Sequence, residues 1–196
     1  MAHLPVSRET LIGLYFPAKK GEIDRYAHLL TTAGIEKGLI GPREAERIWE
    51  RHIFNSIPVT SLIPEGSTVI DIGSGAGLPG IPIALARPDL TVILIEPLKR
   101  RVDFLSEAVE GLGITVLRGR AQDFKLKADF VTARAVAPLD KLKEISWHLV
   151  KKGGSLLAIK GESAADEVEM VPGAQLYEIE LEGLPVGRVI SLPKTG

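Results

Sequence analysis

Length, composition and charge describe an ordinary globular chain and exclude several kinds of site. The 196 residues suit one α/β domain with a small extension, and 45% hydrophobic with 25% charged residues is typical of a soluble globular protein. The chain has no cysteine, and its four histidines lack metal-ligand spacing, so neither disulfides nor a metal site is expected. Without a signal sequence or an apolar run of membrane-spanning length, we expect a cytoplasmic protein that has no membrane partner.

Residues 1–65 are expected to form a helical cap, and residues 66–196 a ligand-binding sheet domain. Apolar residues recur at helical spacing over residues 45–57, which predicts one helix there. The glycine-rich residues 31–42 are predicted to be a loop. We expect the two parts to pack together as one compact unit.

From residue 66 onward, short apolar runs alternate with amphipathic stretches. The predicted strands are residues 68–72, 90–95, 114–117, 128–133 and 155–159, and the predicted helices are residues 79–87, 98–112, 138–150 and 163–170. Two final runs, 175–181 and 188–192, are expected to pair antiparallel. This order predicts an α/β fold with a doubly wound, mostly parallel sheet. Ligands bind at the carboxyl ends of the strands of such sheets.

The most informative segment is the glycine-rich stretch after the first predicted strand. Asp71 ends the strand, and Gly73, Gly75 and Gly77 follow at alternate positions. Glycine permits positive φ and leaves no Cβ between the backbone and a ligand. A carboxylate at Asp71 would repel a pyrophosphate and attract a cation. The segment therefore favours S-adenosylmethionine, which carries an ammonium and a sulfonium.

The same glycines leave other interpretations open. Residues 75–80 also satisfy the G-x-G-x-x-G pattern of dinucleotide-binding proteins, and Glu96 lies about 20 residues further on, as a ribose-binding acid would. An NAD-dependent oxidoreductase is therefore an alternative, although this length leaves little room for a second domain. A non-catalytic binding module on the same fold is another.

Polar or small residues follow the second and third predicted strands, where a parallel sheet builds its site. Glu96 ends the second strand and is the expected acceptor for two ribose hydroxyls. Ala121 and Gln122 follow the third strand and are expected beside the adenine. With the glycine loop, they complete a predicted nucleoside site.

Basic residues end the fourth and fifth predicted strands. Arg134 is expected to face the ligand cleft and to orient the cofactor or the substrate base, or else to form an ion pair with Asp129 or Asp71. Lys160 is expected either to contact RNA or to lie on a solvated rim. His52 is expected to be a partly buried, hydrogen-bonded histidine rather than a catalytic one.

The charge is unevenly distributed along the chain. Residues 99–160 carry 13 basic and 7 acidic side chains, a local charge of +6 in a chain of net charge −1. Such a segment favours an anionic partner such as RNA. The expected phosphate contacts are Lys99, Arg100, Arg118 and Arg120.

Several motifs together resemble one known family. They are Arg51-His52-Ile53 with Asn55-Ser56, Asp71-Ile72-Gly73-Ser74-Gly75-Ala76-Gly77-Leu78-Pro79-Gly80-Ile81-Pro82, Lys99-Arg100-Arg101-Val102-Asp103-Phe104-Leu105, Arg118-Gly119-Arg120-Ala121, Ala133-Arg134-Ala135-Val136-Ala137 and Ala158-Ile159-Lys160-Gly161-Glu162. From about Tyr26 onward, the chain is similar to the small-subunit ribosomal RNA guanine-N7 methyltransferases, also called glucose-inhibited division protein B.

The resemblance implies a class I S-adenosylmethionine-dependent methyltransferase with a seven-stranded sheet. It implies that the cofactor leaves as S-adenosylhomocysteine and that the partner is 16S ribosomal RNA or the small ribosomal subunit. It places cofactor-binding positions at Gly73, Leu78, Ala121, Gln122 and Arg134. We expect a monomer. A methyltransferase with another substrate is the main alternative.

The expected chemistry needs no general base. Guanine N7 carries a lone pair that is not protonated near neutral pH, so its methylation removes no proton from the nucleophile. Catalysis is then a matter of holding the methyl group and N7 in line at near-attack distance. Arg134 is the residue expected to provide this orientation.

Overall fold

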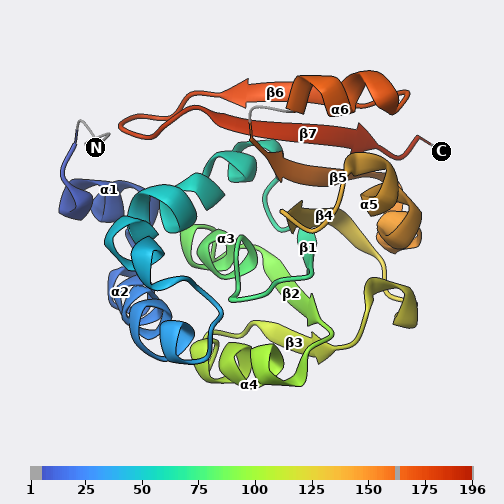
Figure 1. The fold of residues 1–196 in the computed structure, drawn as a ribbon. Coiled ribbons are helices and arrows are strands. Elements are labelled where there is room, and N and C mark those ends of the chain that lie inside the picture. Colours follow the sequence, from blue (N-terminus) through green and yellow to red (C-terminus); the bar gives the residue numbers. More distant parts are fainter. Residues whose placement is uncertain (1–5, 162–163, 196) are drawn as a thin grey trace.

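The computed structural model describes residues 6–161 and 164–195 and contains one seven-stranded sheet with helices on both faces (Figure 1). The strand order is β3-β2-β1-β4-β5-β7-β6. The strands are β1 (Thr68–Ile72), β2 (Thr91–Glu96), β3 (Thr115–Arg118), β4 (Ala128–Arg134), β5 (Val150–Lys160), β6 (Gln175–Ile179) and β7 (Gly187–Pro193). The first five run parallel, and β7 pairs antiparallel with both β5 and β6. The predicted α/β class and the final antiparallel pair are confirmed.

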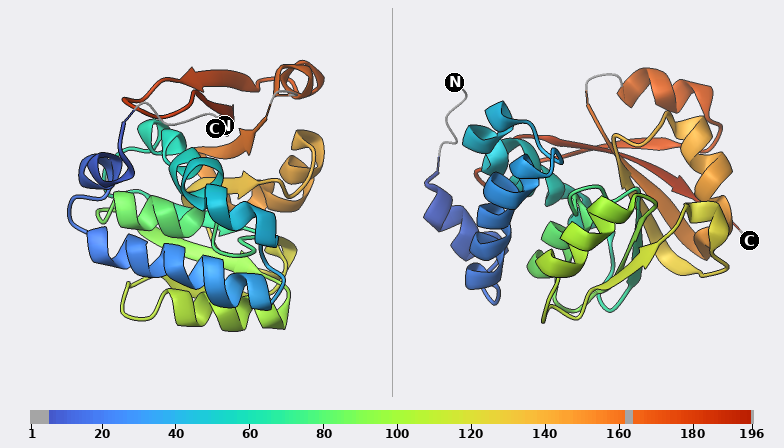
Figure 2. Two further views of the ribbon diagram at one scale, coloured as in Figure 1. Left: turned by 60° about the vertical axis from the view of Figure 1, so that its left-hand side comes forward. Right: turned by 60° about the horizontal axis from the view of Figure 1, so that its bottom comes forward.

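Helices cover the two faces of the sheet and bury a separate apolar cluster on each. The helices are α1 (Arg8–Tyr15), α2 (Lys20–Leu29), α3 (Gly80–Ala86), α4 (Lys99–Ala108), α5 (Leu139–Ser146) and α6 (Ala164–Met170). The first cluster includes residues of α1 to α4, and the second includes residues of α5 and α6, which Figure 2 shows on the other side of the sheet. None of the described helices is long and apolar enough to cross a membrane.

The central strands are largely apolar because both of their faces are buried. In β1, Val69 points into the first cluster, whereas Ile70 and Ile72 point into the second. Asp71 is on the same face as Val69, since side chains alternate along a strand. Its position on the α3 side of the sheet matters for the site described below.

The N-terminal segment is helical but less regular than predicted. In place of one helix over residues 45–57, the chain forms a 3₁₀ helix at Pro42–Arg47, a π-helical turn at Trp49–Ile53 and a 3₁₀ turn at Phe54–Ser56. The spacing of the hydrophobic residues indicates which side of this segment is buried, but it does not determine which backbone hydrogen bonds form. The segment shares the first apolar cluster with the sheet.

The predicted loop over residues 31–42 is partly wrong, because α2 continues into a π-helical turn at Leu30–Gly34. Thr31 and Thr32 allow this, since their hydroxyls donate to carbonyls of the preceding turn at 3.1 and 2.8 Å.

The remaining differences are at element ends. The helix predicted over residues 98–112 stops at Ala108, and the one over 138–150 stops at Ser146 before a 3₁₀ turn. Strand β5 starts five residues earlier than expected, because Gly153 and Gly154 pair with the backbone of Lys194. Residue 163 of the helix predicted over 163–170 lies outside the described residues.

Candidate functional site

A pocket of about 320 Å³ opens where β1 and β4 end, at the carboxyl edge of the parallel strands. This is the edge at which doubly wound sheets bind ligands, and the volume is at the lower end of the range for small-molecule sites. The pocket is lined by Leu39, Ile40, Gly41, Glu44, His52, Gly73, Ser74, Gly75, Ala76, Leu78, Arg101, Arg134 and Ala135. It therefore joins the glycine loop, the end of β4, one residue of α4 and the N-terminal segment.

The glycine loop has a backbone that only glycine adopts easily. Gly73, Gly75 and Gly77 have φ values of 62, 60 and 98°, in the left-handed region. A Cβ on Gly73 would approach Val136 to 2.9 Å, so the close passage of this loop beside the β4 end also needs glycine. The sequence-based interpretation of this segment as a tight turn is confirmed.

A tyrosine from the N-terminal segment fixes the loop from behind. Tyr26 of α2 is only 1% exposed, and its hydroxyl donates to the carbonyl of Ala76 at 2.8 Å. The contact joins residues that are 50 positions apart. No local sequence motif indicates it, and Tyr26 is not among the site residues expected from the sequence.

Asp71 does not line the pocket, which corrects the expectation that its carboxylate faces a cationic ligand. The side chain is fully buried on the α3 side of β1. One oxygen accepts the backbone N–H of Gly80 at 3.2 Å, and the other accepts the hydroxyl of Thr132 at 3.2 Å. Burial raises the pKa of the Asp71 carboxyl to about 7, so near neutral pH it is only partly ionised. Asp71 supports the end of the loop.

Glu96 supports the same loop from the β2 side. Its carboxylate accepts the backbone N–H groups of Gly75 and Leu98, each at 2.9 Å, and lies 3.6 Å from the guanidinium of Arg101. The side chain is 1% exposed and does not line the pocket. Ribose recognition by Glu96 stays a prediction. Arg101, which lines the pocket beside it, was not selected from the sequence.

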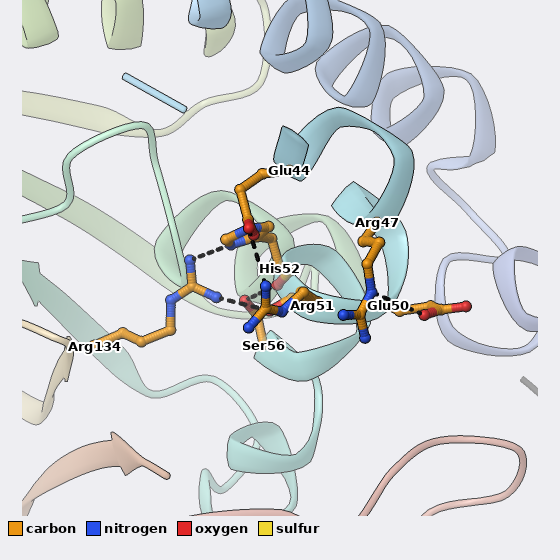
Figure 3. A network of polar contacts seen from close by, with 7 residues as sticks. All are labelled: Glu44, Arg47, Glu50, Arg51, His52, Ser56 and Arg134. Carbon is orange, nitrogen blue, oxygen red and sulfur yellow. Dashed lines mark hydrogen bonds and ion pairs between the residues drawn. The ribbon is translucent and has the colours of Figure 1, made fainter. Parts of the chain in front are cut away.

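Arg134 projects from the end of β4 into the pocket, as expected (Figure 3). Its guanidinium contacts Nδ1 of His52 at 3.1 Å and the backbone carbonyl of Arg51 at 3.4 Å. The alternative of an ion pair with Asp71 or Asp129 is not observed, and Arg134 forms no ion pair with any carboxylate of the described residues. Its positive charge therefore remains available to a ligand.

His52 is partly buried and hydrogen-bonded at both ring nitrogens, as expected. Its Nε2 lies 2.8 Å from a carboxylate oxygen of Glu44, and the other Glu44 oxygen accepts from Arg51 at 2.9 Å. Burial lowers the pKa of His52, an effect that nearby Arg134 and Arg51 reinforce and that Glu44 opposes. Glu44 also lines the pocket, although no sequence pattern indicated it.

The other predicted site residues lie at different distances from this pocket. Gly73, Gly75 and Leu78 line it, whereas Gly77, Ala121 and Gln122 do not. Ala121 is buried in a 3₁₀ turn after β3, and Gln122 is exposed. The adenine-binding role of the latter two stays a prediction.

Lys160 is not the exposed cation that either of its expected roles required. Its amine lies 2.7 Å from Glu167 and donates to the carbonyl of Ala137 at 2.9 Å, and its side chain is 10% exposed. Glu167 also accepts the backbone N–H of Leu139, so the pair joins β5, α6 and the start of α5. Lys160 is a structural residue in this arrangement.

The four other expected RNA contacts are on the surface. Lys99 pairs with Asp103 at 2.7 Å in an exposed i,i+4 contact, which contributes little to stability. Arg100, Arg118 and Arg120 are exposed and have no ion pair within the described part of the chain. Lys99 and Arg100 follow the end of β2, Arg118 is the last residue of β3 and Arg120 comes just after it, so all four are at the same edge of the sheet as the pocket.

A second cavity, of about 460 Å³, adjoins the first at Arg134 and Ala135. It is lined by Asn55, Arg134, Ala135, Val136, Ala137, Pro138, Ile159, Lys160, Gly161 and Glu167. Arg134 and Ala135 line both cavities, and Ala135 has a positive φ of 53°, which is uncommon for a residue with a Cβ. The two cavities are therefore adjacent at the end of β4.

Comparisons with known proteins agree with the motifs described above. The family model for rRNA small subunit methyltransferase G matches residues 19–181. A ribosomal RNA small subunit methyltransferase G from Mycolicibacterium gilvum is 52% identical over 175 residues, covering 86% of this chain and 77% of the relative. One from Thermobifida fusca is 58% identical over 150 residues, covering 74% of this chain and 63% of the relative.

Solved structures show the same fold at much lower identity. A putative S-adenosyl-L-methionine-dependent methyltransferase from Methanococcus maripaludis has a TM-score of 0.55 at 16% identity, covering 91% of this chain and 94% of that one. A methyltransferase from Pyrococcus furiosus has a TM-score of 0.54 at 14% identity, covering 71% of this chain and 84% of that one. With the strand order, these similarities confirm the expected class I methyltransferase fold.

Proposed function

Because the chain belongs to the rRNA small subunit methyltransferase G family, we propose that it transfers the methyl group of S-adenosylmethionine to N7 of a guanine in 16S ribosomal RNA. Family membership leaves the NAD-dependent alternative without support. The observation that carries the proposal is that, in a chain of this family, the glycine loop and Arg134 line one pocket. A methyltransferase acting on another substrate is the outcome that the experiments must exclude.

The pocket fits S-adenosylmethionine by the chemistry of its lining. That molecule carries a carboxylate and two cationic groups and supplies an electrophilic methyl group on its sulfonium. The pocket offers the guanidinium of Arg134, which has no carboxylate partner among the described residues, together with the anionic side chain of Glu44. The glycine loop offers a backbone without intervening Cβ atoms, at Gly73 and Gly75. Both signs of charge are thus present in one small space.

In the proposed site, Arg134 binds the carboxylate of the donor or stacks against the target base. A guanidinium matches a carboxylate with two parallel N–H donors, and it also stacks on planar rings. Asp71 and Glu96 act on the cofactor mainly by fixing the loop, through their bonds to Gly80 and Gly75. Ribose recognition by Glu96 and adenine contacts by Ala121 and Gln122 complete the proposed nucleoside site.

The second cavity is the proposed place for the target guanine. It shares Arg134 and Ala135 with the cofactor pocket, so a base in it would lie next to the transferred group. Enzymes that modify a base commonly take it out of its stack. The side chain of Asn55, at the edge of this cavity, can donate and accept hydrogen bonds at the base edge.

Positioning is the proposed source of catalysis. The lone pair of guanine N7 attacks the methyl carbon while the carbon–sulfur bond breaks, and no proton leaves the nucleophile. Alignment of the two reactants can lower the barrier by several kcal/mol. The residues of this chain therefore need to bind, align and exclude water, and none is required to act as a base.

The proposed partner is 16S ribosomal RNA or the small ribosomal subunit, bound by a monomer in the cytoplasm. Arg100, Arg118 and Arg120 are the proposed phosphate contacts, because they are exposed at the pocket edge of the sheet. Lys99 is a further proposed phosphate contact, although its amine is paired with Asp103.

Replacement of Arg134 tests the site directly. Arg134→Ala should weaken S-adenosylmethionine binding by at least tenfold in titration calorimetry, since a charge-assisted hydrogen bond contributes about 1.5–3 kcal/mol. Arg134→Lys keeps the charge but loses the planar donor pair, so its affinity for S-adenosylmethionine should lie between those of the wild type and Arg134→Ala. The exposed Arg43→Ala is the matched control and should bind as the wild type does. Unchanged affinity in Arg134→Ala would remove Arg134 from the cofactor site.

A further inference from the structure

Arg134 reaches the pocket with its guanidinium held, among the described residues, by neutral acceptors alone. One terminal N–H donates to Nδ1 of His52 at 3.1 Å, and another donates to the carbonyl of Arg51 at 3.4 Å (Figure 3). A direct carboxylate partner would hold this side chain equally well, but it would also neutralise the charge that a ligand carboxylate needs. A neutral imidazole orients the guanidinium and leaves its charge in place.

The contacts determine which nitrogen of His52 carries the proton. Arginine has only donors, so the His52 Nδ1 that faces it must present a lone pair. The proton of the neutral ring is then on Nε2, which donates to the Glu44 carboxylate at 2.8 Å. Glu44 therefore selects the tautomer that Arg134 needs, as second partners of functional histidines commonly do.

Further contacts hold Glu44 and His52, the two residues behind Arg134. The second oxygen of Glu44 is held by Arg51 at 2.9 Å, and the carbonyl of His52 accepts the hydroxyl of Ser56 at 2.7 Å. The Glu44 carboxylate is thus held at both oxygens, and the backbone of His52 is held by Ser56. The chain of contacts runs from the N-terminal segment, through the imidazole, to the end of β4.

We propose that His52, oriented by Glu44, is a positioning residue that holds Arg134 toward the methyl donor, and that its protonation releases Arg134. This inference rests on the proposed function, because the role of Arg134 does. A proton on Nδ1 would turn the acceptor into a donor and place a second positive charge against the guanidinium. Protonation therefore breaks the contact instead of strengthening it.

Burial, together with the neighbouring arginines, favours the neutral form of His52 near neutral pH. Burial, Arg134 and Arg51 lower its pKa, whereas Glu44 raises it, and the net direction is downward from the ordinary value of 6.5. Arg101 is the remaining charged residue that lines the same pocket. The proposed contact is accordingly intact at pH 7.5 and above, and it weakens progressively as the pH falls below about 6.5.

Two substitutions at His52 distinguish the loss of the hydrogen-bond acceptor for Arg134 from the protonation of the imidazole. His52→Asn places an amide oxygen where Nδ1 stands, so it can accept from Arg134 but cannot be protonated in this range. His52→Ala removes the acceptor. The exposed His28→Ala on α2 is the control for a general effect of losing a histidine.

The measurement is titration calorimetry with S-adenosylmethionine from pH 5.5 to 8.0, with a thermal melt of each variant at every pH. At pH 8.0 we expect His52→Ala to bind at least tenfold more weakly than the wild type, and His52→Asn to bind within about threefold of it. Between pH 8.0 and 5.5, the wild type and His28→Ala should lose affinity, whereas His52→Asn should lose much less. In Glu44→Gln, the loss of affinity on acidification should occur at lower pH than in the wild type, because the variant lacks the charge that raises the pKa of His52.

Two results with the variants would overturn the inference. Wild-type affinity in a folded His52→Ala at pH 8.0 would show that Arg134 needs no help from His52. The same acid loss in His52→Asn as in the wild type would show that another group titrates. The proposed function is judged separately: a wild type that binds the donor but methylates no small-subunit RNA contradicts that function and leaves the positioning result standing. A wild type that does not bind the donor contradicts both.

Discussion

Two buried carboxylates, Asp71 and Glu96, hold the glycine loop through backbone N–H groups. Both are next to glycines in space because β1 and β2 are parallel neighbours and end at the same edge. Carboxylates that accept backbone N–H bonds organise a loop without lining the pocket it forms. At Asp71 the cost of burial exceeds the gain from these bonds, which is why its pKa is raised.

Replacing Asp71 should change how stability depends on pH. The folded-state pKa is about 7, above the ordinary 3.8, so between these values the folded state keeps a proton that the unfolded state has lost. Its contribution is therefore fully present below pH 3.8 and disappears as the pH rises to 7, by roughly 4 kcal/mol at most. In urea unfolding from pH 4 to 7, Asp71→Asn should show a flatter profile than the wild type.

Asp89→Asn is the matched control for this measurement. Asp89 pairs with Arg87, which lowers its pKa to about 2, so its contribution is lost only below pH 4. The slope of the Asp89→Asn profile between pH 4 and 7 should equal that of the wild type. An equal slope in Asp71→Asn would mean that Asp71 is ionised without penalty in the folded protein.

The sequence patterns predicted which residues lie at the pocket better than they predicted what those residues contact. Gly73, Gly75, Leu78 and Arg134 were predicted and do line the pocket. The orientation of Asp71 could have been derived from strand alternation, but its partners Gly80 and Thr132 depend on how α3 and β4 pack. Glu44 was not predicted because its contact with His52 forms only in an irregular helical segment.

Among the elements, the N-terminal helices are part of the site and not only a cover. They share one apolar cluster with α3 and α4, and they supply Glu44 and His52 to the pocket. Tyr26 carries this connection into the loop through its bond to Ala76. We expect changes in this segment to reach cofactor binding.

Loss of the Tyr26 hydroxyl should weaken both stability and cofactor binding. Tyr26→Phe keeps the ring in the core but leaves the buried carbonyl of Ala76 without its donor, at a cost of about 1–3 kcal/mol. Chemical unfolding and calorimetry with S-adenosylmethionine measure the two effects. Tyr15→Phe is the control, because it removes a tyrosine bond to a backbone carbonyl, that of Glu182, in an exposed place away from the loop. Equal effects of the two variants on cofactor affinity would separate Tyr26 from the site.

The parallel strands were predictable because short, largely apolar runs alternate with amphipathic stretches, which favours buried strands joined by helices. The irregular N-terminal turns were not. Residues 45–57 show helical spacing, yet 3₁₀ and π-helical hydrogen bonds replace a regular α-helix there. Spacing identifies the buried side chains, such as Ile48 and Ile53, but the hydrogen-bond register is decided by tertiary packing.

For the whole molecule, the fold divides the basic segment between two ends of the sheet. Lys99, Arg100, Arg118 and Arg120 are at or just after the carboxyl ends of β2 and β3, at the pocket edge of the sheet. Other members of the segment, such as Lys127, stand at the amino ends of strands. The charge count over residues 99–160 therefore predicts a basic character, but only the topology says which charges lie near the site.

Removing two of these charges should weaken RNA binding without changing the chemical step. Arg118→Ala with Arg120→Ala should raise KM for small-subunit RNA and leave kcat at saturating RNA unchanged. The slope of log K against log salt should fall by about 0.7–0.9 for each phosphate interaction removed. The exposed Lys20→Ala on α2 is the control and should keep the wild-type slope. An unchanged slope in the double variant would locate the RNA surface elsewhere.

The most direct test of the proposed activity is nucleoside mass spectrometry after a reaction with methyl-labelled S-adenosylmethionine. The substrate is small-subunit RNA, free and in the particle, from cells that lack this gene. We expect one labelled 7-methylguanosine with the wild type and at least a tenfold lower rate with Arg134→Ala. Label on another atom, on another molecule, or on nothing would contradict the proposed activity.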